Sequence, residues 1–293
     1  MIALTSKNYP NIAQSFGITG IVVLGTLLLS PVNMVLNKLI GKEASMLVYY
    51  LLAVGLPLAI VYSIRKSKTQ RCSFNLDIEN KRTIPFVVVG TIALLFGVIS
   101  PIASTIPVPD SIKKALLDFG SQTGIFAFIL MVIAAPVLEE IIFRGIMLDG
   151  LLRQYSPVKS ILISSFLFGL VHLNPWQFVT GFIIGIFSGW VYCQTQSLSL
   201  SVIIHAAANL SGYITRHFID MDTSVNETLT EAYGGTTRAV LIISGTVLIA
   251  GMCIYFLHRE FQKQQPKKDW LHPSEPISSA DTFLSAGKEK LGK

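Results

Sequence analysis

The chain of 293 residues is 51% hydrophobic and only 14% charged, and its mean hydropathy is +0.58. Soluble domains carry about 25% charged residues, so this composition excludes an ordinary soluble protein and indicates an integral membrane protein. The net charge of +6 does not indicate a nucleic-acid partner, because the basic residues gather between apolar segments, as they do beside membranes.

Eight apolar runs are close to the length that crosses the ~30 Å hydrocarbon core of a bilayer, which takes roughly 17–25 helical residues. No charge interrupts the second, third or eighth run, and the fifth run is short. The predicted fold class is therefore an all-α, polytopic membrane protein with about eight transmembrane helices. In chain order the predicted spans are 16–35, 46–64, 84–104, 124–147, 158–173, 176–193, 198–216 and 239–257.

Lys and Arg are distributed unevenly between the two sides of these spans. With both termini on one side, that side carries 17 of the 23 Lys and Arg residues, and the other side carries six. Cytoplasmic loops are enriched in positive charge. We therefore expect an integral protein of the bacterial cytoplasmic membrane with both termini in the cytoplasm. The expected parts are a cytoplasmic N-terminus (1–15), a transmembrane domain (16–257) and a basic, disordered cytoplasmic tail (258–293).

The fourth span carries Glu139, Glu140 and Arg144 inside the apolar stretch "PVLEEIIFRGIM". Charges inside a membrane are costly, and they usually face a bundle interior or a watery cavity. Glu140 and Arg144 are four residues apart with the acid first, which favours an ion pair along one helix. Glu139 lies ~100° around the helix from Glu140 and has no such partner. Of the three, Glu139 is the expected general acid or base.

Two later spans add polar side chains. His172 closes the fifth span, four residues after Phe168, and the seventh span places His205 and Asn209 on one helix face. A carboxylate, two imidazoles and an amide in one cavity can activate a water and hold an oxyanion. Two His and one Glu are also a zinc ligand set, so a divalent metal on Glu139, His172 and His205 is an alternative. The three side chains are predicted at different depths along their spans. They therefore meet only if helices tilt or the fifth span begins deep in the membrane.

The sixth span has a stripe of glycines, Gly181, Gly185 and Gly189, at every fourth residue. Small residues at this spacing let two membrane helices approach closely. We interpret the stripe as a packing surface without a chemical role.

The polar residues form three motifs in order, "EEIIFR" (139–144), "FGLVH" (168–172) and "HAAAN" (205–209). Over about 124–215 the sequence resembles the CAAX prenyl protease and bacteriocin-processing (CPBP, or Abi) family of intramembrane proteases. That family has a Glu-Glu-x-x-x-Arg motif, then Phe-x-x-x-His, then His-x-x-x-Asn. It also usually has Thr-Gly-Ser-Leu before the third motif, and Gln196 replaces the glycine here.

The resemblance implies hydrolysis of a peptide bond in a membrane-associated or prenylated peptide or protein, at a site inside the helix bundle. Members of the family are described with either a metal or a glutamate-activated water; we favour glutamate–histidine chemistry without an obligatory metal or other cofactor, and the oligomeric state stays open. By position, the implied site residues are Glu139 as the water activator, assisted by His172, with His205 and Asn209 on the oxyanion side and Glu140 and Arg144 as the supporting pair.

Two other classes of function stay open at the level of the sequence. One is a catalytically silent membrane scaffold that regulates a signalling partner, since a fold does not determine a function. The other is a proton-coupled transporter, in which Glu and His form a relay. The halves of the sequence show no inverted repeat, and the intramembrane charges concentrate in spans four to seven, which argues against the transporter.

Overall fold

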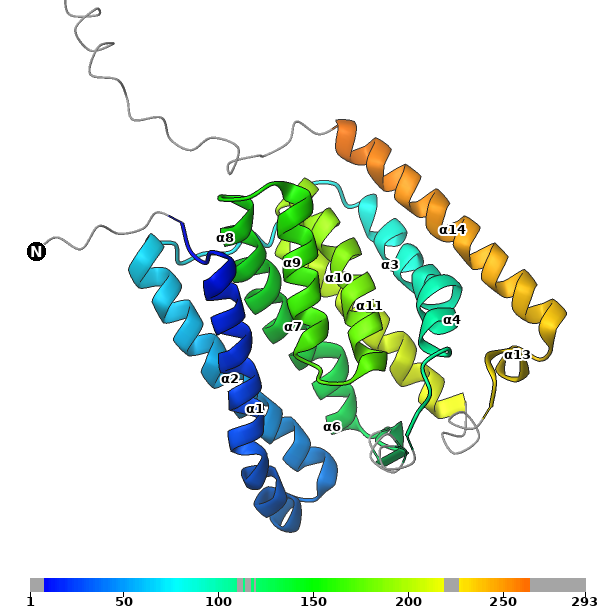
Figure 1. Ribbon diagram of the computed structural model, residues 1–293, viewed down its shortest axis with the longest axis horizontal. Helices are drawn as coiled ribbons and strands as arrows, with labels where there is room; N and C mark the ends of the chain where they lie inside the picture. The colour runs from blue at the N-terminus through cyan, green and yellow to red at the C-terminus, as the bar shows by residue number, and fades with distance from the viewer. Residues whose placement is uncertain (1–7, 110–112, 114–116, 119, 219–226, 264–293) are drawn as a thin grey trace, which may run out of the picture.

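The computed structural model describes residues 8–109, 113, 117–118, 120–218 and 227–263. These residues form helices without any strand, which confirms the all-α prediction (Figure 1). Seven helical stretches are long and apolar enough to cross a membrane. They are Ile12–Ile40 (α1), Lys42–Thr69 (α2), Thr83–Ala103 (α3, η1 and α4), Ile125–Leu152 (α6 to α8), Pro175–Thr195 (α10), Leu198–Phe218 (α11) and Thr236–Lys263 (α14).

Two of these stretches contain π-helical segments. The third consists of α3 (Thr83–Leu94), η1 (Leu95–Ile99) and α4 (Ser100–Ala103). The fourth consists of α6 (Ile125–Phe128), η2 (Ile129–Ala134), α7 (Ala135–Glu140), η3 (Ile141–Leu148) and α8 (Asp149–Leu152). π turns occur frequently at functional sites, and here they flank α7, the segment that carries both glutamates.

The fifth predicted span forms an apolar helix, α9 (Pro157–Leu170), that is shorter than the seven stretches above, so the part of the chain that the structure describes has seven long candidate spans and one short one. Helix α9 has 14 residues, which cover about 21 Å, less than the ~30 Å of hydrocarbon. Leu173 adopts a left-handed conformation with φ of 56°, and the side chain of Asn174 accepts a hydrogen bond from the Gln177 backbone at the start of α10. His172 consequently lies in a turn at the end of a short helix.

Two predicted boundaries differ from the structure. Helix α1 begins at Ile12, because the side chain of Asn11 accepts a hydrogen bond from the Gln14 backbone and forms a capping box. Helix α14 continues to Lys263, so the predicted tail boundary at 258 falls inside a helix. The rest of the predicted tail (264–293), like residues 1–7, lies outside the described residues.

The α6–α8 stretch lies in the middle of the bundle (Figure 1). Helices α2, α9 and α11 pack against it, and α1 packs against α2 and α9. Helix α3 packs against α11, and α14 covers α3 at the far edge. Every residue from 142 to 152 is buried, so any charge on this stretch depends on protein groups for its partners.

The glycine stripe of α10 packs against α9, as the spacing predicted. A Cβ atom on Gly185 would lie 2.9 Å from the Cβ atom of Ser165, and one on Gly181 would lie 3.1 Å from the Cα atom of Gly169. Gly189 faces the same helix. The two backbones come this close only because these positions lack side chains.

Candidate active site

One cavity of about 690 Å³ is lined by all four of the predicted catalytic residues. Glu139 reaches it from α7, His172 from the turn after α9, and His205 and Asn209 from α11. These residues meet because α9 ends at Leu170, so that His172 does not extend to the far end of the bundle. Most of the remaining wall comes from α2, from η1 and α4, and from the ends of α10 and α11.

The two carboxylate oxygens of Glu139 have different surroundings. Oε1 accepts a hydrogen bond from the hydroxyl group of Tyr50 on α2. Oε2 is buried, has no hydrogen-bond partner among the described residues, and lies 3.9 Å from His205 Nε2. A buried carboxylate oxygen without a donor is unfavourable, so Oε2 marks a position where a donor from a bound molecule would be stabilised.

Glu140 is fully buried and has three partners. Arg144 Nη1 donates to Oε1 at 3.0 Å, so the ion pair expected from the i, i+4 spacing forms. His205 Nδ1 lies 3.0 Å from the same oxygen, and the hydroxyl group of Ser188 donates to Oε2 at 3.3 Å. Glu140 therefore also orients the imidazole ring of His205, a contact that the spacing did not predict.

Phe168 packs the charged and aromatic members of the site together. The Cζ atom of Arg144 lies 4.5 Å from the centroid of the Phe168 ring. The rings of His172 and His205 each lie 5.4 Å from it, edge to face. Arg144 also donates to the Gly185 carbonyl oxygen at 3.2 Å. The first residue of the "FGLVH" motif thus positions groups from all three motifs.

The hydrogen bonds of the two histidines leave their Nε2 atoms for other partners. His172 Nδ1 donates to the Phe168 carbonyl oxygen at 2.9 Å, and His205 Nδ1 is bound to Glu140. A neutral ring then accepts at Nε2, and a protonated ring donates there. Asn209 donates to the Met131 carbonyl oxygen at 2.8 Å, which fixes its side chain and leaves its second N–H group and its oxygen for a ligand.

Sequence reasoning missed several polar residues of the cavity wall, among them Tyr50 and Arg216. Tyr50 lies 89 residues before Glu139 in an apolar span, and nothing in its local pattern distinguishes it from a packing aromatic residue. Arg216 also lines the cavity, although from the sequence its charge was only counted on the outer side, at the end of the seventh span. Both residues become recognisable as site residues when the helices are assembled.

The predicted metal ligands do not form a three-ligand set in this arrangement. Among the described residues, no group of three or more His, Cys, Asp or Glu side chains is placed to hold a metal ion. Glu139 Oε2 and His205 Nε2 lie 3.9 Å apart, and their other polar atoms bind Tyr50 and Glu140, which is also how a metal-ligating histidine is commonly held. The metal alternative stays a prediction, and we assign no catalytic step to a metal.

Comparison with known families identifies the central part of the chain. A sequence model of the type II CAAX prenyl endopeptidase Rce1-like family matches residues 121–211, the part that holds all three motifs. No curated protein matches the chain. No solved structure matches it either. The chain therefore carries, at residues 121–211, an Rce1-like domain of the type II CAAX prenyl endopeptidases in the CPBP family.

Proposed function

We propose that this protein is an intramembrane endopeptidase in which Glu139 activates a water molecule to hydrolyse a peptide bond of a membrane-associated or prenylated substrate. The observation that carries the proposal is the buried, unpartnered Oε2 atom of Glu139, 3.9 Å from His205 Nε2 in a cavity that also contains His172. The family match supports the reaction class.

In the proposed mechanism, Tyr50 holds one oxygen of Glu139 so that the other faces the water. Glu139 accepts a proton from this water, and the water oxygen attacks the carbonyl carbon of the peptide bond. Glu139 then gives the proton to the departing amine nitrogen. His172 assists by accepting a hydrogen bond from the water at Nε2, the nitrogen that its bond to Phe168 leaves for a ligand.

The carbonyl oxygen becomes an oxyanion in the tetrahedral intermediate and needs hydrogen-bond donors. A protonated His205 donates from Nε2 while Glu140 holds its Nδ1, and the second N–H group of Asn209 lies on the same face of α11. The short separation between Glu139 Oε2 and His205 Nε2 suits an intermediate whose two oxygens contact both groups.

The cavity wall is consistent with an apolar substrate. Leu95, Phe96, Ile99 and Leu130 line it together with the polar residues. Pockets of ~300–1,000 Å³ enclose small ligands, so a volume of about 690 Å³ accommodates several side chains of an extended peptide or part of a lipid chain. We propose that the substrate enters with its apolar part against this wall.

The test uses purified full-length protein in lipid with a mixed pool of membrane-anchored and prenylated peptides, and mass spectrometry to detect products. Wild type and the control Glu227→Gln, which removes an exposed carboxylate outside the cavity, are expected to cleave. Glu139→Gln is expected to lose activity by at least about 10²-fold, because a general base contributes about 10²–10⁴. Addition of a chelator tests metal dependence separately.

The scaffold alternative gives a different result in the same experiment. A catalytically silent scaffold yields no product from any variant, and Glu139→Gln then supports the same cellular phenotype as wild type. Product formation by Glu139→Gln at the rate of wild type would contradict the proposed role of this glutamate.

A further inference from the structure

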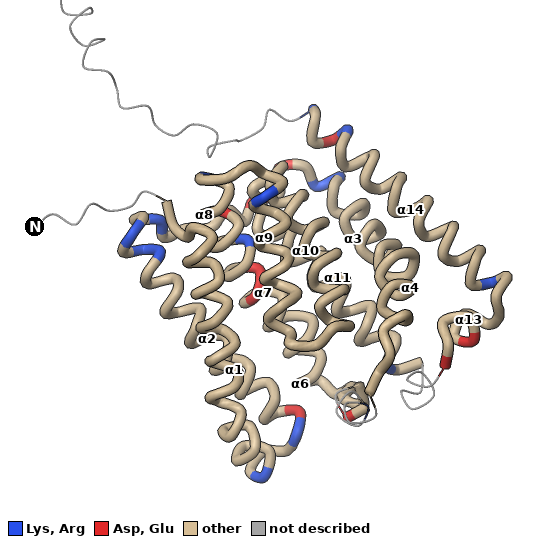
Figure 2. Tube along the Cα trace, viewed as in Figure 1, with Lys and Arg blue, Asp and Glu red and all other residues tan. Residues whose placement is uncertain are grey.

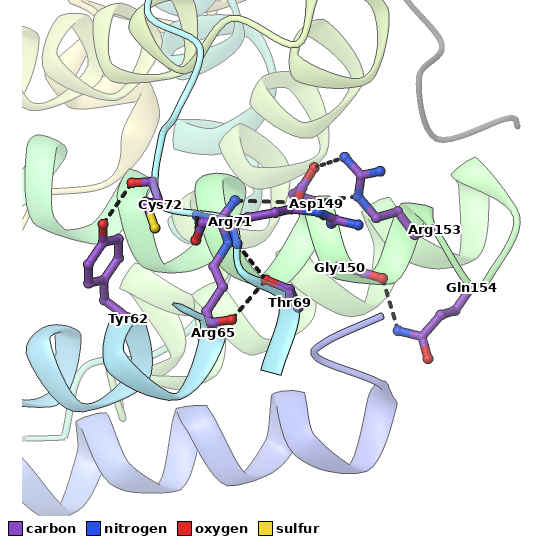
Figure 3. Close-up of polar contacts among 9 residues, drawn as sticks. All are labelled: Tyr62, Arg65, Thr69, Arg71, Cys72, Asp149, Gly150, Arg153 and Gln154. Carbon is purple, nitrogen blue, oxygen red and sulfur yellow. Dashed lines mark hydrogen bonds and ion pairs between the residues drawn. The ribbon is translucent and has the colours of Figure 1, made fainter. Parts of the chain in front are cut away.

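A second cavity, of about 700 Å³, lies toward the opposite end of the α6–α8 stretch and shares no lining residue with the catalytic cavity. Its walls come from the end of α2, the connector after it, η3, α8 and α10. The charged residues that line it are three arginines and one aspartate: Arg65, Arg71, Arg153 and Asp149 (Figure 3).

Asp149 is the common partner of the three arginines. Its carboxylate lies 3.1 Å from Arg153 Nη2, 3.4 Å from Arg71 Nη1 and 3.7 Å from Arg65 Nη2. The side chains that line this cavity carry three positive charges and one negative charge. Burial lowers the pKa of the Arg71 guanidinium, and the neighbouring charge of Arg153 lowers it further, which shows that the cations repel one another here.

Arg65 is the most deeply placed of the three, with 4% of its side chain exposed. Its guanidinium carbon lies 4.7 Å from the centroid of the Phe74 ring, and Nη1 makes a long hydrogen bond of 3.5 Å to the Arg71 carbonyl oxygen. Its buried Nε atom has no hydrogen-bond partner among the residues that the structure describes. A buried N–H donor of a charged group without an acceptor is unfavourable, so this arginine indicates that an acceptor belongs in the cavity.

The connector that closes the cavity is fixed by its own hydrogen bonds. The hydroxyl group of Tyr62 donates to the Cys72 carbonyl oxygen at 2.7 Å, and the backbone N–H of Arg71 donates to the Thr69 hydroxyl at 3.2 Å (Figure 3). Further along, the backbone N–H of Leu198 donates to the carbonyl oxygen of Asn75 at 2.9 Å. The walls are thus ordered before a ligand binds, which lowers the entropic cost of binding.

The position of the cavity indicates where its ligand comes from. The basic ends of α2 and α3 lie at the same end of the bundle (Figure 2), with Lys66, Lys81 and Arg82 exposed there. This is the end that the charge distribution assigns to the cytoplasmic membrane surface. Basic pockets between membrane helices on this side bind anionic lipid headgroups.

We propose that Arg65, Arg71 and Arg153 form a binding site for a phosphate group, supplied by the headgroup of an anionic phospholipid. Guanidinium groups match the oxygens of a phosphate through paired, charge-assisted hydrogen bonds. The cavity volume exceeds what a bare phosphate ion needs, so it has room for the glycerol part of a headgroup. A soluble phosphate compound presents the same chemistry and is the other source to be distinguished.

The test measures thermal unfolding of the purified, delipidated full-length protein in neutral detergent. Separate samples receive phosphatidylglycerol, phosphatidylcholine or inorganic phosphate. We expect phosphatidylglycerol to raise the midpoint and phosphatidylcholine to leave it unchanged. Titration should show the Arg71→Gln/Arg153→Gln variant binding phosphatidylglycerol at least about tenfold more weakly, because charge-assisted contacts to the phosphate are lost.

A matched control separates a specific site from general attraction to a basic surface. Lys66→Gln/Lys81→Gln removes the same charge from the same end of the molecule but outside the cavity, and it should bind phosphatidylglycerol as wild type does. A second variant, Ser73→Asp, keeps every arginine and adds a carboxylate to the cavity wall. Ser73→Asp should also abolish binding of phosphatidylglycerol. If the double arginine variant fails to fold, this variant tests the site in its place.

The proposal would be overturned if the lysine control lost as much affinity for phosphatidylglycerol as the cavity variants. It would also be overturned if neither lipid nor inorganic phosphate changed the thermal midpoint of wild type. A response to inorganic phosphate that matches the response to the lipid would retain the phosphate site but overturn the lipid as its occupant. Because binding is read without any substrate, the outcome is independent of proteolytic activity.

Discussion

At the scale of single residues, Glu139 and Glu140 are neighbours in the chain with different surroundings. Glu140 is enclosed by Arg144, His205 and Ser188 and serves structure and orientation. Glu139 faces the cavity with one oxygen unpartnered among the described residues. This contrast follows from the helical rotation between adjacent positions, which turns one side chain toward α10 and α11 and the other toward Tyr50.

Substitution of Glu140 should therefore cost stability as well as activity. Glu140→Gln leaves the Arg144 guanidinium buried without its ion-pair partner, and we expect a loss of about 3–5 kcal/mol, visible as a lower thermal midpoint in detergent. Glu139→Gln should stay close to wild type in the same measurement. Replacement of both members of the pair, by Glu140→Gln with Arg144→Met, should recover part of the loss. A midpoint for Glu140→Gln equal to that of wild type would contradict this account.

The sequence predicted the residues of the site whose contacts are local or belong to a motif. The Glu140–Arg144 pair follows from i, i+4 spacing, and His172, His205 and Asn209 follow from the three motifs. Contacts between helices were not predictable in this way. Tyr50 approaches Glu139 from a distant helix, and no local pattern encodes the packing that brings α2 to α7.

At the scale of the elements, the site depends on how closely α10 approaches its neighbours. The glycine stripe brings α10 against α9, and α10 then supplies the Gly185 carbonyl oxygen to Arg144 and the Ser188 hydroxyl to Glu140. The stripe was predicted as a packing surface, but its contribution to the polar partners of Arg144 was not. The π-helical segments on both sides of α7 were also not predicted, since residue type gives no clear signal for them.

A methyl group on the stripe should separate the two helices. In Gly185→Ala the new Cβ atom would meet the Cα and Cβ atoms of Ser165 at 3.1 and 2.9 Å, and we expect a destabilisation of about 1–3 kcal/mol from overpacking. Gly245→Ala on α14 is the matched control, because nothing lies within 4 Å of its added Cβ atom. The measurement is the thermal midpoint of each variant, and an equal response of both would contradict the packing role of the stripe.

At the scale of the whole molecule, the two cavities lie toward opposite ends of one central helical stretch. The candidate active-site cavity is lined by residues near the α1–α2 turn, and the arginine-lined cavity is lined by residues at the end of α2 and in α8. The composition predicted the helical membrane fold correctly. The fifth span was predicted too long, because the apolar run at 158–173 extends past the end of α9 at Leu170 into a turn.

The proposed orientation predicts a definite pattern of cysteine labelling. Cys72 is exposed, and Cys193 and Cys253 are buried. With both termini in the cytoplasm, a membrane-impermeant maleimide should label Cys72 only after the cells are permeabilised. In a Cys72→Ala background, Glu227→Cys should be labelled in intact cells. The reverse pattern would show that the charge distribution was misinterpreted and that the arginine-lined cavity faces outward.

The most direct test of the central claim is peptide cleavage in water enriched in heavy oxygen, with wild type and Glu139→Gln compared by mass spectrometry. The account predicts that wild type places one heavy oxygen atom in the new carboxylate of the product, and that Glu139→Gln, folded to the same midpoint, forms at least about 10²-fold less product. Products formed without heavy oxygen, or at equal rates by both proteins, would contradict hydrolysis by a water that Glu139 activates.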